Sequence, residues 1–322
     1  MRTLLLLPFA LLAVLTPLAF AACSDKSTPA AATPVDAGNP DAILGEYDPV
    51  PFGGSRPVQL YVPSGYTGAP TPLVILLHGY SATGGEEDLY LGLREVAEAK
   101  TVLYAHPDGT TDPAGNEFWN ATDACCNFYG STVDDSSYLA SLITEFGMRY
   151  SVDPTRIYFI GHSNGAFMSY RMACDHADVV AAIVSIAGAM WEDTSRCTPT
   201  SPVSVLEVHG TADAEIHYDG GVIGPIEGGT QAATPYPGAT TTVADWATFD
   251  RCATPPDTSQ PPVDIDGNPG TSTSVTQYLA GCTTPTQVNL WTIQNEGHVP
   301  GFNSSFAPMA FDFLLAHARP GG

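Results

Sequence analysis

Length, composition and charge already restrict the class of protein. The chain has 322 residues, 44% of them hydrophobic, which is enough for one large core or two ordinary ones. Its 34 acidic side chains outnumber the 11 basic ones for a formal net charge of −23, and we expect no nucleic-acid partner because this balance excludes a basic binding surface.

The amino terminus has the pattern of an export signal, and we expect a signal peptide over residues 1–22. Met1-Arg2 is followed by an apolar run over 4–15 and then by small residues ahead of Cys23. The run is too short for a transmembrane anchor, and one Pro lies inside it. Residues 18–23 resemble a bacterial lipobox, which implies lipidation of Cys23 after cleavage.

The lipobox has one departure, because Phe20 stands where an aliphatic residue is usual, so free secretion is the alternative. We expect an extracellular protein, or a lipoprotein of a bacterial outer membrane or cell surface that contacts the membrane only through a lipid on Cys23. Residues 23–48, rich in Ala, Pro, Asp and Thr, are expected to be a flexible tether. A folded domain, expected to be a monomer, follows over 49–322.

The domain alternates short apolar runs with helical periodicity. Asp134 or Asp135 can cap a helix that buries Leu139 and Leu142, and residues 166–170 mark another helix. This alternation predicts a doubly wound α/β domain with a mostly parallel sheet. The predicted strands are 58–62, 73–77, 102–105, 157–160, 181–186, 203–208 and 288–293.

Three intervals between these elements bear on the architecture. The segments 219–240 and 253–280 are polar and rich in turn residues, so we expect surface excursions there. Only residues 189–203 separate two predicted strands where a lid is often inserted, which leaves no room for a helical lid domain. The run D-I-D-G-N at 264–268 resembles the opening of a calcium loop but lacks the later Glu ligand, so a turn is expected and no metal site is predicted.

The sequence G-H-S-N-G at 161–165 matches the G-x-S-x-G pattern of a nucleophilic serine. It directly follows a predicted strand and opens a predicted helix, which is the context that a nucleophile elbow requires. The alternative is a tight glycine turn with an idle serine. We therefore predict Ser163 as a nucleophile.

A serine nucleophile needs a base and an acid that orients the base, in the chain order Ser, acid, His. Asp213 follows the predicted strand 203–208, and His298 follows the strand 288–293, both at carboxyl ends of strands where open sheets place their sites. Asp213 and His298 are therefore the predicted acid and base. Their rivals are Glu296 and Asp219 for the acid, and His209, His217 and His317 for the base, of which His209 is expected to be structural and the other two to lie at the rim or surface.

The predicted reaction also needs two backbone N–H donors for an oxyanion. Asn164, the residue after the nucleophile, supplies one. The strand 73–77 ends in His78-Gly79-Tyr80, so we expect the N–H of Tyr80 to be the second.

The cysteines fit an exported chain. Leaving Cys23 aside, an even number remains and predicts three disulfides. Because a bond between neighbours would strain the peptide, Cys125 and Cys126 are each expected to reach a distant partner. Cys252 and Cys282 are the expected pair around a polar loop. The six candidates are Cys125, Cys126, Cys174, Cys197, Cys252 and Cys282. No C-x-x-C pair occurs among them, so neither a zinc site nor a cofactor is predicted.

An ordered set of segments resembles the secreted feruloyl esterase and polyhydroxybutyrate depolymerase family of α/β-hydrolases over about residues 45–318. The segments are LLHGYSATG, AHPDGT, FWNATDACC, VDDSSYLASLI, VDPTRIYFIGHSNGAFM, HGTADAEIHYDGG and EGHVPGF. The resemblance implies an extracellular carboxylic-ester hydrolase whose nucleophile, acid and base match Ser163, Asp213 and His298. It also implies that Trp119 and the pair Asp134-Asp135 lie near the cleft, although acidic residues at a helix start are equally explained as caps.

The resemblance leaves the substrate open. Val299 departs from the family, in which an aromatic residue often precedes the Pro-Gly, and the choice between plant-wall phenolic esters, acetylated sugars and polyhydroxyalkanoates is not made. Without a lid we expect an open, shallow cleft that prefers short-chain or aromatic acyl groups, including esters borne on a polymer. Tyr80, Trp119, Tyr129 and Trp191 are the aromatic candidates to line it.

Two other classes of function remain as alternatives to a serine esterase. A peptidase of the same fold is disfavoured because neither a propeller domain nor a helical cap is evident. A lipid-anchored polymer-binding protein with a decayed site is disfavoured because every catalytic position is filled.

Overall fold

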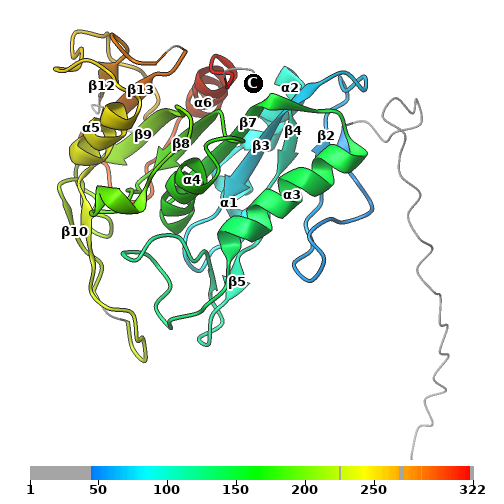
Figure 1. Ribbon diagram of the computed structural model, residues 1–322, viewed down its shortest axis with the longest axis horizontal. Helices are drawn as coiled ribbons and strands as arrows, with labels where there is room; N and C mark the ends of the chain where they lie inside the picture. Colours follow the sequence, from blue (N-terminus) through cyan, green and yellow to red (C-terminus); the bar gives the residue numbers. More distant parts are fainter. Residues whose placement is uncertain (1–44, 225, 268–271, 284, 320–322) are drawn as a thin grey trace, which may run out of the picture. The chain divides into compact units, whose positions relative to one another are not determined.

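A central sheet of nine strands carries the fold (Figure 1). The computed structural model describes residues 45–224, 226–267, 272–283 and 285–319. The strand order is β1-β2-β4-β3-β7-β8-β9-β13-β12. The bounds are β1 (Glu46–Tyr47), β2 (Tyr61–Val62), β3 (Thr71–Leu77), β4 (Leu103–Ala105), β7 (Val152–His162), β8 (Ala182–Ile186), β9 (Ser204–Gly210), β12 (Thr273–Tyr278) and β13 (Val288–Ile293).

The central strands run parallel, from β4 through β3, β7, β8 and β9 to β13, whereas β1, β2 and β12 pair antiparallel at the edges. Every residue of β3, β8, β9 and β13 is buried. Parallel strands covered on both faces read as continuous apolar runs, which is how the sequence predicts them. The predicted doubly wound, mostly parallel α/β fold is confirmed.

Six helices cover the two faces of the sheet among the described residues. Their bounds are α1 (Gly84–Leu91), α2 (Leu93–Lys100), α3 (Asp135–Arg149), α4 (Asn164–Asp175), α5 (Ala239–Phe249) and α6 (Phe306–Leu315). Alternate residues of β3 belong to two separate apolar clusters, Ile75 to one and Val74 to the other. The first cluster takes residues of α3, α4 and α5, and the second takes residues of α1, α2 and α6. Figure 1 shows α3 and α4 crossing in front of the sheet.

The two acids at the start of α3 have different roles. Asp134 is the N-cap, and its carboxylate accepts a hydrogen bond from the Ser137 N–H at 3.0 Å, as the capping prediction requires. Asp135 is fully buried, lies 2.5 Å from Arg56 Nη1, and accepts the Asn120 N–H at 2.7 Å. Asp135 therefore ties the helix to two loops.

The two predicted surface excursions contain regular structure. Residues 253–280 include β12, whose alternating burial adds an antiparallel edge strand next to β13, and Ile265 is fully buried. Residues 219–240 include the hairpin of β10 (Gly220–Val222) and β11 (Pro235–Pro237). The remaining small sheet joins β5 (Thr110–Thr111) to β6 (Glu117–Phe118).

The predicted tether is too long at its carboxyl end, because β1 at Glu46–Tyr47 already belongs to the sheet. The predicted signal peptide, Cys23 and the rest of the tether lie outside the described residues. No helix among the described residues has the length and apolar character needed to span a bilayer.

Three disulfides are present among the described residues, and one of them corrects the sequence prediction. Cys252 bonds Cys282 as predicted, and Cys174 bonds Cys197. Cys125 and Cys126 bond each other, so the prediction that each reaches a distant partner is wrong. The peptide between them is cis, and their Cα atoms lie 3.1 Å apart.

The interval where a lid is often inserted is short. Residues 187–203 link β8 to β9 and contain one regular element, the 3₁₀ turn Thr194–Arg196. No lid domain therefore covers the carboxyl edge of the sheet from this interval.

Asp250, at the end of α5, is a buried acid whose titration should affect stability. It is 1% exposed; one carboxylate oxygen accepts the Val203 N–H at 3.3 Å, and the other has no hydrogen-bond partner among the described residues. Burial raises the pKa of Asp250 to about 7. The folded state therefore keeps a proton that the unfolded chain releases above pH ~4.

We predict that Asp250 lowers the free energy of unfolding as pH rises from about 4 to about 7, by at most about 1.4 kcal/mol per pH unit. Asp250→Asn should remove this contribution, so the variant should gain stability relative to wild type at pH 7.5 but not at pH 4. Urea unfolding of both proteins at the two pH values measures the difference. If the difference in unfolding free energy between Asp250→Asn and wild type is the same at both pH values, the assignment is contradicted.

Candidate active site

The turn between β7 and α4 presents Ser163 at the carboxyl edge of the sheet. Ser163 has φ +54°, a left-handed conformation that few residues with a side chain adopt. A Cβ on Gly161 would lie 2.1 Å from the Gly165 carbonyl oxygen, and a Cβ on Gly165 would lie 2.0 Å from the Leu77 carbonyl oxygen. Both glycines of the motif are therefore required by close backbone packing, as a nucleophile elbow demands.

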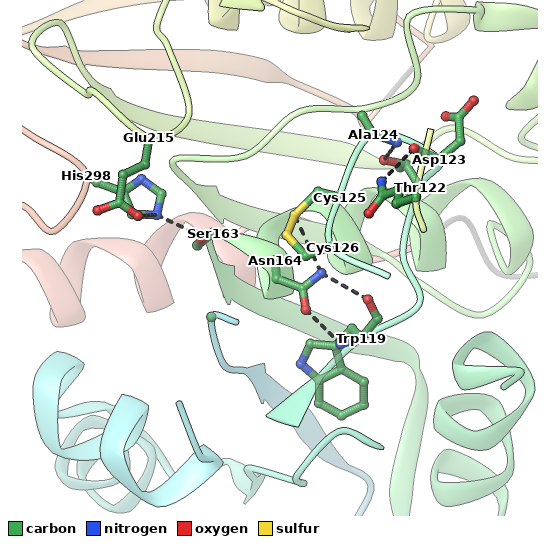
Figure 2. Close-up of a disulfide and its surroundings, with 12 residues drawn as sticks. Trp119, Thr122, Asp123, Ala124, Cys125, Cys126, Ser163, Asn164, Glu215 and His298 are labelled. Atoms are coloured by element: carbon green, nitrogen blue, oxygen red, sulfur yellow. Dashed lines mark hydrogen bonds and ion pairs between the residues drawn. A yellow bond between two sulfur atoms is a disulfide. The ribbon is translucent and has the colours of Figure 1, made fainter. Parts of the chain in front are cut away.

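Two neighbouring parallel strands bring an acid and a base to this serine. β9 and β13 pair in register, with Gly210 opposite Ile293, so the loops that carry Asp213 and His298 leave the sheet side by side. His298 Nε2 lies 2.8 Å from Ser163 Oγ, and His298 Nδ1 lies 2.8 Å from Asp213 Oδ2. Figure 2 shows the serine and imidazole facing each other, with Glu215 beside the imidazole. The structure thus brings the three predicted residues into one hydrogen-bond chain.

Asp213 is held ionised by four donors. Its Oδ1 accepts the N–H groups of Glu215 and Ile216, each at 2.9 Å, and its Oδ2 faces His298 at 2.8 Å and His209 Nε2 at 3.3 Å. Burial alone would raise the pKa of Asp213, but hydrogen bonds from the two imidazoles hold it well below its ordinary value. Asp213 therefore carries its charge wherever the fold persists.

His209 is a buried structural partner of this acid, as the sequence indicated. Its Nδ1 lies 3.1 Å from Glu207 Oε1 and its Nε2 lies 2.8 Å from the Ile216 carbonyl oxygen. Burial alone would lower the pKa of His209, but its hydrogen bonds to Asp213 and Glu207 raise it to about 9. Tyr170 donates a hydrogen bond to the second oxygen of Glu207 at 3.1 Å. The His209 ring therefore lies between the side chains of Asp213 and Glu207, and burial raises the pKa of Glu207.

The predicted oxyanion donors lie on either side of the serine. The loop after β3 carries Tyr80, and a Cβ on its neighbour Gly79 would stand 3.4 Å from the Ser163 Cβ. Asn164 is fully buried, and its side chain accepts the Trp119 N–H at 2.7 Å and donates to the Trp119 carbonyl at 3.0 Å (Figure 2). Trp119 thus fixes Asn164 through its backbone.

A pocket of about 400 Å³ opens over Ser163. Its walls come from the loop after β3, from α1 and from the loop that carries His298, and include Tyr80, Glu87, Tyr90, His162 and Val299. Tyr80 lines it as predicted, with its hydroxyl bonded to Asp112 at 2.6 Å. Val299 is 60% exposed at the mouth, where the family often has an aromatic residue.

The other three aromatic candidates do not line this pocket. Trp119 is fully buried in the core. Trp191 is also buried and borders a separate pocket of about 550 Å³ near Asn120 and Arg171. Tyr129 is turned toward the 219–240 segment, where its hydroxyl donates to the Glu227 carbonyl at 3.3 Å. The Asp134-Asp135 pair likewise lies outside the residues that line the pocket over Ser163.

The rival acids and bases lie away from the serine or in other roles. Asp219 and His217 are exposed, whereas Glu296 is buried in the loop before His298. His317, expected at the surface, is buried and its Nδ1 lies 2.7 Å from the Phe313 carbonyl oxygen. That position follows from its place at the end of α6, which packs on the sheet.

Sequence reasoning missed several residues of the pocket, among them Glu87 and His162. His162 lies inside the serine motif and directly precedes Ser163, which was a signal for proximity. Glu87 had no signal, because it stands in an acidic helix start that typically faces solvent. Among the described residues, no group of three or more His, Cys, Asp or Glu side chains is arranged to hold a metal ion.

Comparisons with known proteins agree with this geometry. Residues 66–222 match the family model described as phospholipase/carboxylesterase. Feruloyl esterase B of Piromyces equi is 28% identical over 269 residues, covering 82% of this chain and 46% of that protein. Poly(3-hydroxyalkanoate) depolymerase C of Paucimonas lemoignei is 27% identical over 149 residues, covering 45% of this chain and 35% of that protein. The chain therefore spans less than half the length of both relatives.

A solved structure agrees in fold. The acetyl xylan esterase of Aspergillus awamori superposes with a TM-score of 0.55 at 16% identity. The superposition covers 84% of this chain and 100% of the esterase. At that identity the likeness concerns the fold alone. The strand order, the serine turn and the superposition show the α/β-hydrolase fold, and the chain is similar in sequence to a feruloyl esterase and to a poly(3-hydroxyalkanoate) depolymerase.

Proposed function

We propose that the protein is a serine carboxylic-ester hydrolase. The observation that carries the proposal is the hydrogen-bond chain from Ser163 Oγ through His298 to Asp213, with both links at 2.8 Å, at the floor of an open pocket. Ser163 is the nucleophile, His298 the general base and then acid, and Asp213 the group that orients the imidazole. The names of its sequence relatives, a feruloyl esterase and a poly(3-hydroxyalkanoate) depolymerase, support the same reaction class.

The proposed reaction has two steps. Ser163 Oγ bonds to the ester carbonyl carbon while its proton passes to His298 Nε2, and the N–H groups of Tyr80 and Asn164 stabilise the oxyanion. The carbon–alkoxy bond then breaks, and the leaving alcohol takes the proton from His298. Water repeats the sequence on the acyl-enzyme, losing its proton to His298 and releasing the acid and free Ser163.

We infer that the substrate is an ester of a short-chain or aromatic acid, borne on a polymer. The pocket holds about 400 Å³ and is flanked by Tyr80 and Tyr90, whose rings suit a sugar or a phenolic acid. A long acyl chain gains about 0.8 kcal/mol for each buried methylene, and such burial needs walls on both sides, which the short 187–203 link does not supply. The related feruloyl esterase and polyhydroxyalkanoate depolymerase make both polymer classes candidates.

We further propose that the protein works outside the cell, attached to a membrane by a lipid on Cys23. The proposal rests on the leader-like residues 1–22 and the lipobox resemblance. The disulfides Cys174–Cys197 and Cys252–Cys282 are consistent with an oxidising compartment.

Ser163→Ala should lower kcat/KM for 4-nitrophenyl butyrate by about 10⁴-fold or more while leaving the circular dichroism spectrum unchanged, because the covalent step is lost. Asp213→Asn should cost less, since the imidazole and serine remain. Asp219→Asn, an exposed acid on the same segment, is the matched control and should retain wild-type activity. A Ser163→Ala protein with a tenth of wild-type turnover would exclude this serine.

A peptide anilide and an ester-bearing polymer, tested beside the 4-nitrophenyl ester, separate the alternative functions. A peptidase would cleave a peptide anilide faster than the ester, and a polymer-binding protein would pull down with an ester-bearing polymer while hydrolysing neither compound.

Specificity constants along a series of acyl chains from two to sixteen carbons should peak at four carbons or fewer. The physical reason is the open pocket, in which further methylenes stay in water and add no binding energy. A maximum at twelve carbons or longer would contradict the open pocket. Comparing feruloyl and acetyl esters of the same alcohol then ranks aromatic against short aliphatic acids.

The wild-type protein should partition with membranes of the expressing bacterium, and Cys23→Ala should move it to the soluble fraction. Cys252, which is disulfide-bonded, provides the control: Cys252→Ala should leave the partitioning unchanged. Soluble wild-type protein would instead support free secretion.

A further inference from the structure

A buried carboxylate and a buried imidazole in the pocket wall belong to none of the proposed chemical steps. Glu87 projects from α1, and His162 is the last residue of β7. Glu87 Oε1 lies 3.2 Å from His162 Nδ1, and the two side chains are 3% and 8% exposed. A charged pair so far from water persists only where its geometry supplies strong compensation.

The pair contacts three catalytic segments, each at or beside a proposed catalytic residue. Glu87 Oε2 accepts the Gly79 N–H at 3.1 Å, and Gly79 precedes the oxyanion donor Tyr80. His162 Nε2 lies 2.9 Å from the carbonyl oxygen of His298, the proposed base. His162 itself precedes the nucleophile. The oxyanion loop, the serine turn and the base loop are therefore joined through two side chains.

Both ring nitrogens of His162 face acceptors, which fixes the protonation that the geometry needs. A backbone carbonyl only accepts, so Nε2 must carry a hydrogen, and the carboxylate of Glu87 requires a second hydrogen on Nδ1. Burial alone would lower the pKa of His162 and raise that of Glu87, but their mutual attraction raises the pKa of His162 and lowers that of Glu87. The contacts and both pKa shifts favour an imidazolium paired with a carboxylate.

Resting on the function proposed above, we propose that Glu87 and His162 are positioning residues that hold the oxyanion loop and the base loop in register with Ser163 only while His162 is doubly protonated. A neutral imidazole has one N–H for two acceptors, so its deprotonation gives up either the Glu87 contact or the His298 carbonyl contact. The loss misaligns groups that act in the transition state, and it therefore lowers kcat more than it raises KM.

Other titratable groups surround His162. Tyr90 of α1 packs its ring 5.7 Å from the imidazole, and burial raises its pKa far above the alkaline range of the assay. The His298 ring is tilted, with its centroid 5.1 Å from that of His162, and the charge of Asp213 also raises the pKa of His162. Glu86 and Glu215 carry charge at the pocket mouth. His209, bonded to Asp213, also loses its proton on the alkaline side, so the experiment must separate it from His162.

The test measures kcat and KM between pH 5 and 10 with 4-nitrophenyl acetate, subtracting spontaneous hydrolysis. Wild type should show an alkaline decline in kcat. Glu87→Gln should move that decline at least about one pH unit lower, since His162 loses its counter-charge, and should reduce the maximal kcat about tenfold or more with KM changed less. His162→Gln should show the low kcat without the alkaline decline.

Glu86→Gln is the matched control. Glu86 is the adjacent carboxylate on α1, its side chain bonds Thr83, and glutamine serves the same capping role. Its alkaline decline should stay at the wild-type pH. If the alkaline decline in kcat keeps its wild-type pH in Glu87→Gln but shifts in His209→Gln, the decline belongs to His209 and the proposal is overturned. An effect of Glu87→Gln that is confined to KM would also overturn it.

A second measurement does not depend on activity. In ¹⁵N-labelled Ser163→Ala protein, both ring nitrogens of His162 should give signals of protonated nitrogen at pH 8. These signals are assigned by their absence in a Ser163→Ala, His162→Gln double variant. Adding Glu87→Gln should lower the pH at which the signals are lost. A neutral His162 at pH 8 overturns the positioning pair even if esterase activity is found. A protonated His162 in a protein without esterase activity would instead reject the proposed function and leave the pair in place.

Discussion

The backbone turn at Ser163 is the constraint on which the site depends. β7 ends and α4 begins within one residue at φ +54°, and this reversal fits only because Gly161 and Gly165 lack side chains that would enter neighbouring backbone. The turn fixes the serine hydroxyl at the carboxyl edge of the sheet. The strands β3, β7, β8, β9 and β13 are consecutive and parallel in the sheet. The loops after β3, β9 and β13 therefore leave the sheet at the same edge as Ser163. Topology thus brings distant segments to one serine.

The electrostatics of the site are balanced by imidazoles. Glu87 and Glu207 are almost fully buried, and each faces a histidine, His162 or His209, while Asp213 faces two. In a chain with a net charge of −23 this arrangement lets buried carboxylates stay close to the reacting atoms without a fixed cation such as arginine. Arginine would stay charged at any pH, whereas imidazolium can lose its proton. The support of the site is consequently sensitive to alkaline pH.

The sequence predicts the fold and the central three residues because those features are local or ordered along the chain. Continuous apolar runs mark the parallel strands; Ser163 directly follows one of them, and Asp213 and His298 lie in the loops that follow two others. The sequence did not indicate long-range packing. Trp119 and Trp191 are loop residues, and their burial depends on distant segments of the chain. The edge strand β12 was hidden in a polar stretch, and Glu87 resembled a solvated helix start. The Cys125–Cys126 bond was missed because a bond between neighbouring cysteines was expected to strain the peptide.

No lid lies between β8 and β9, so selection of the acyl group depends on the loops that also carry the proposed catalytic residues. The pocket walls come from the loop with Tyr80, from α1 with Tyr90, and from the loop with His298 and Val299. Tyr90 donates a hydrogen bond to the Pro300 carbonyl at 2.7 Å, so α1 and the base loop are joined at the mouth as well as at Glu87 and His162. The loop that carries Tyr80, α1 and the loop that carries His298 are therefore linked to one another at the wall of the pocket. In such a site, acyl-group preference should be expressed in kcat as much as in KM, because recognition and alignment share the same backbone.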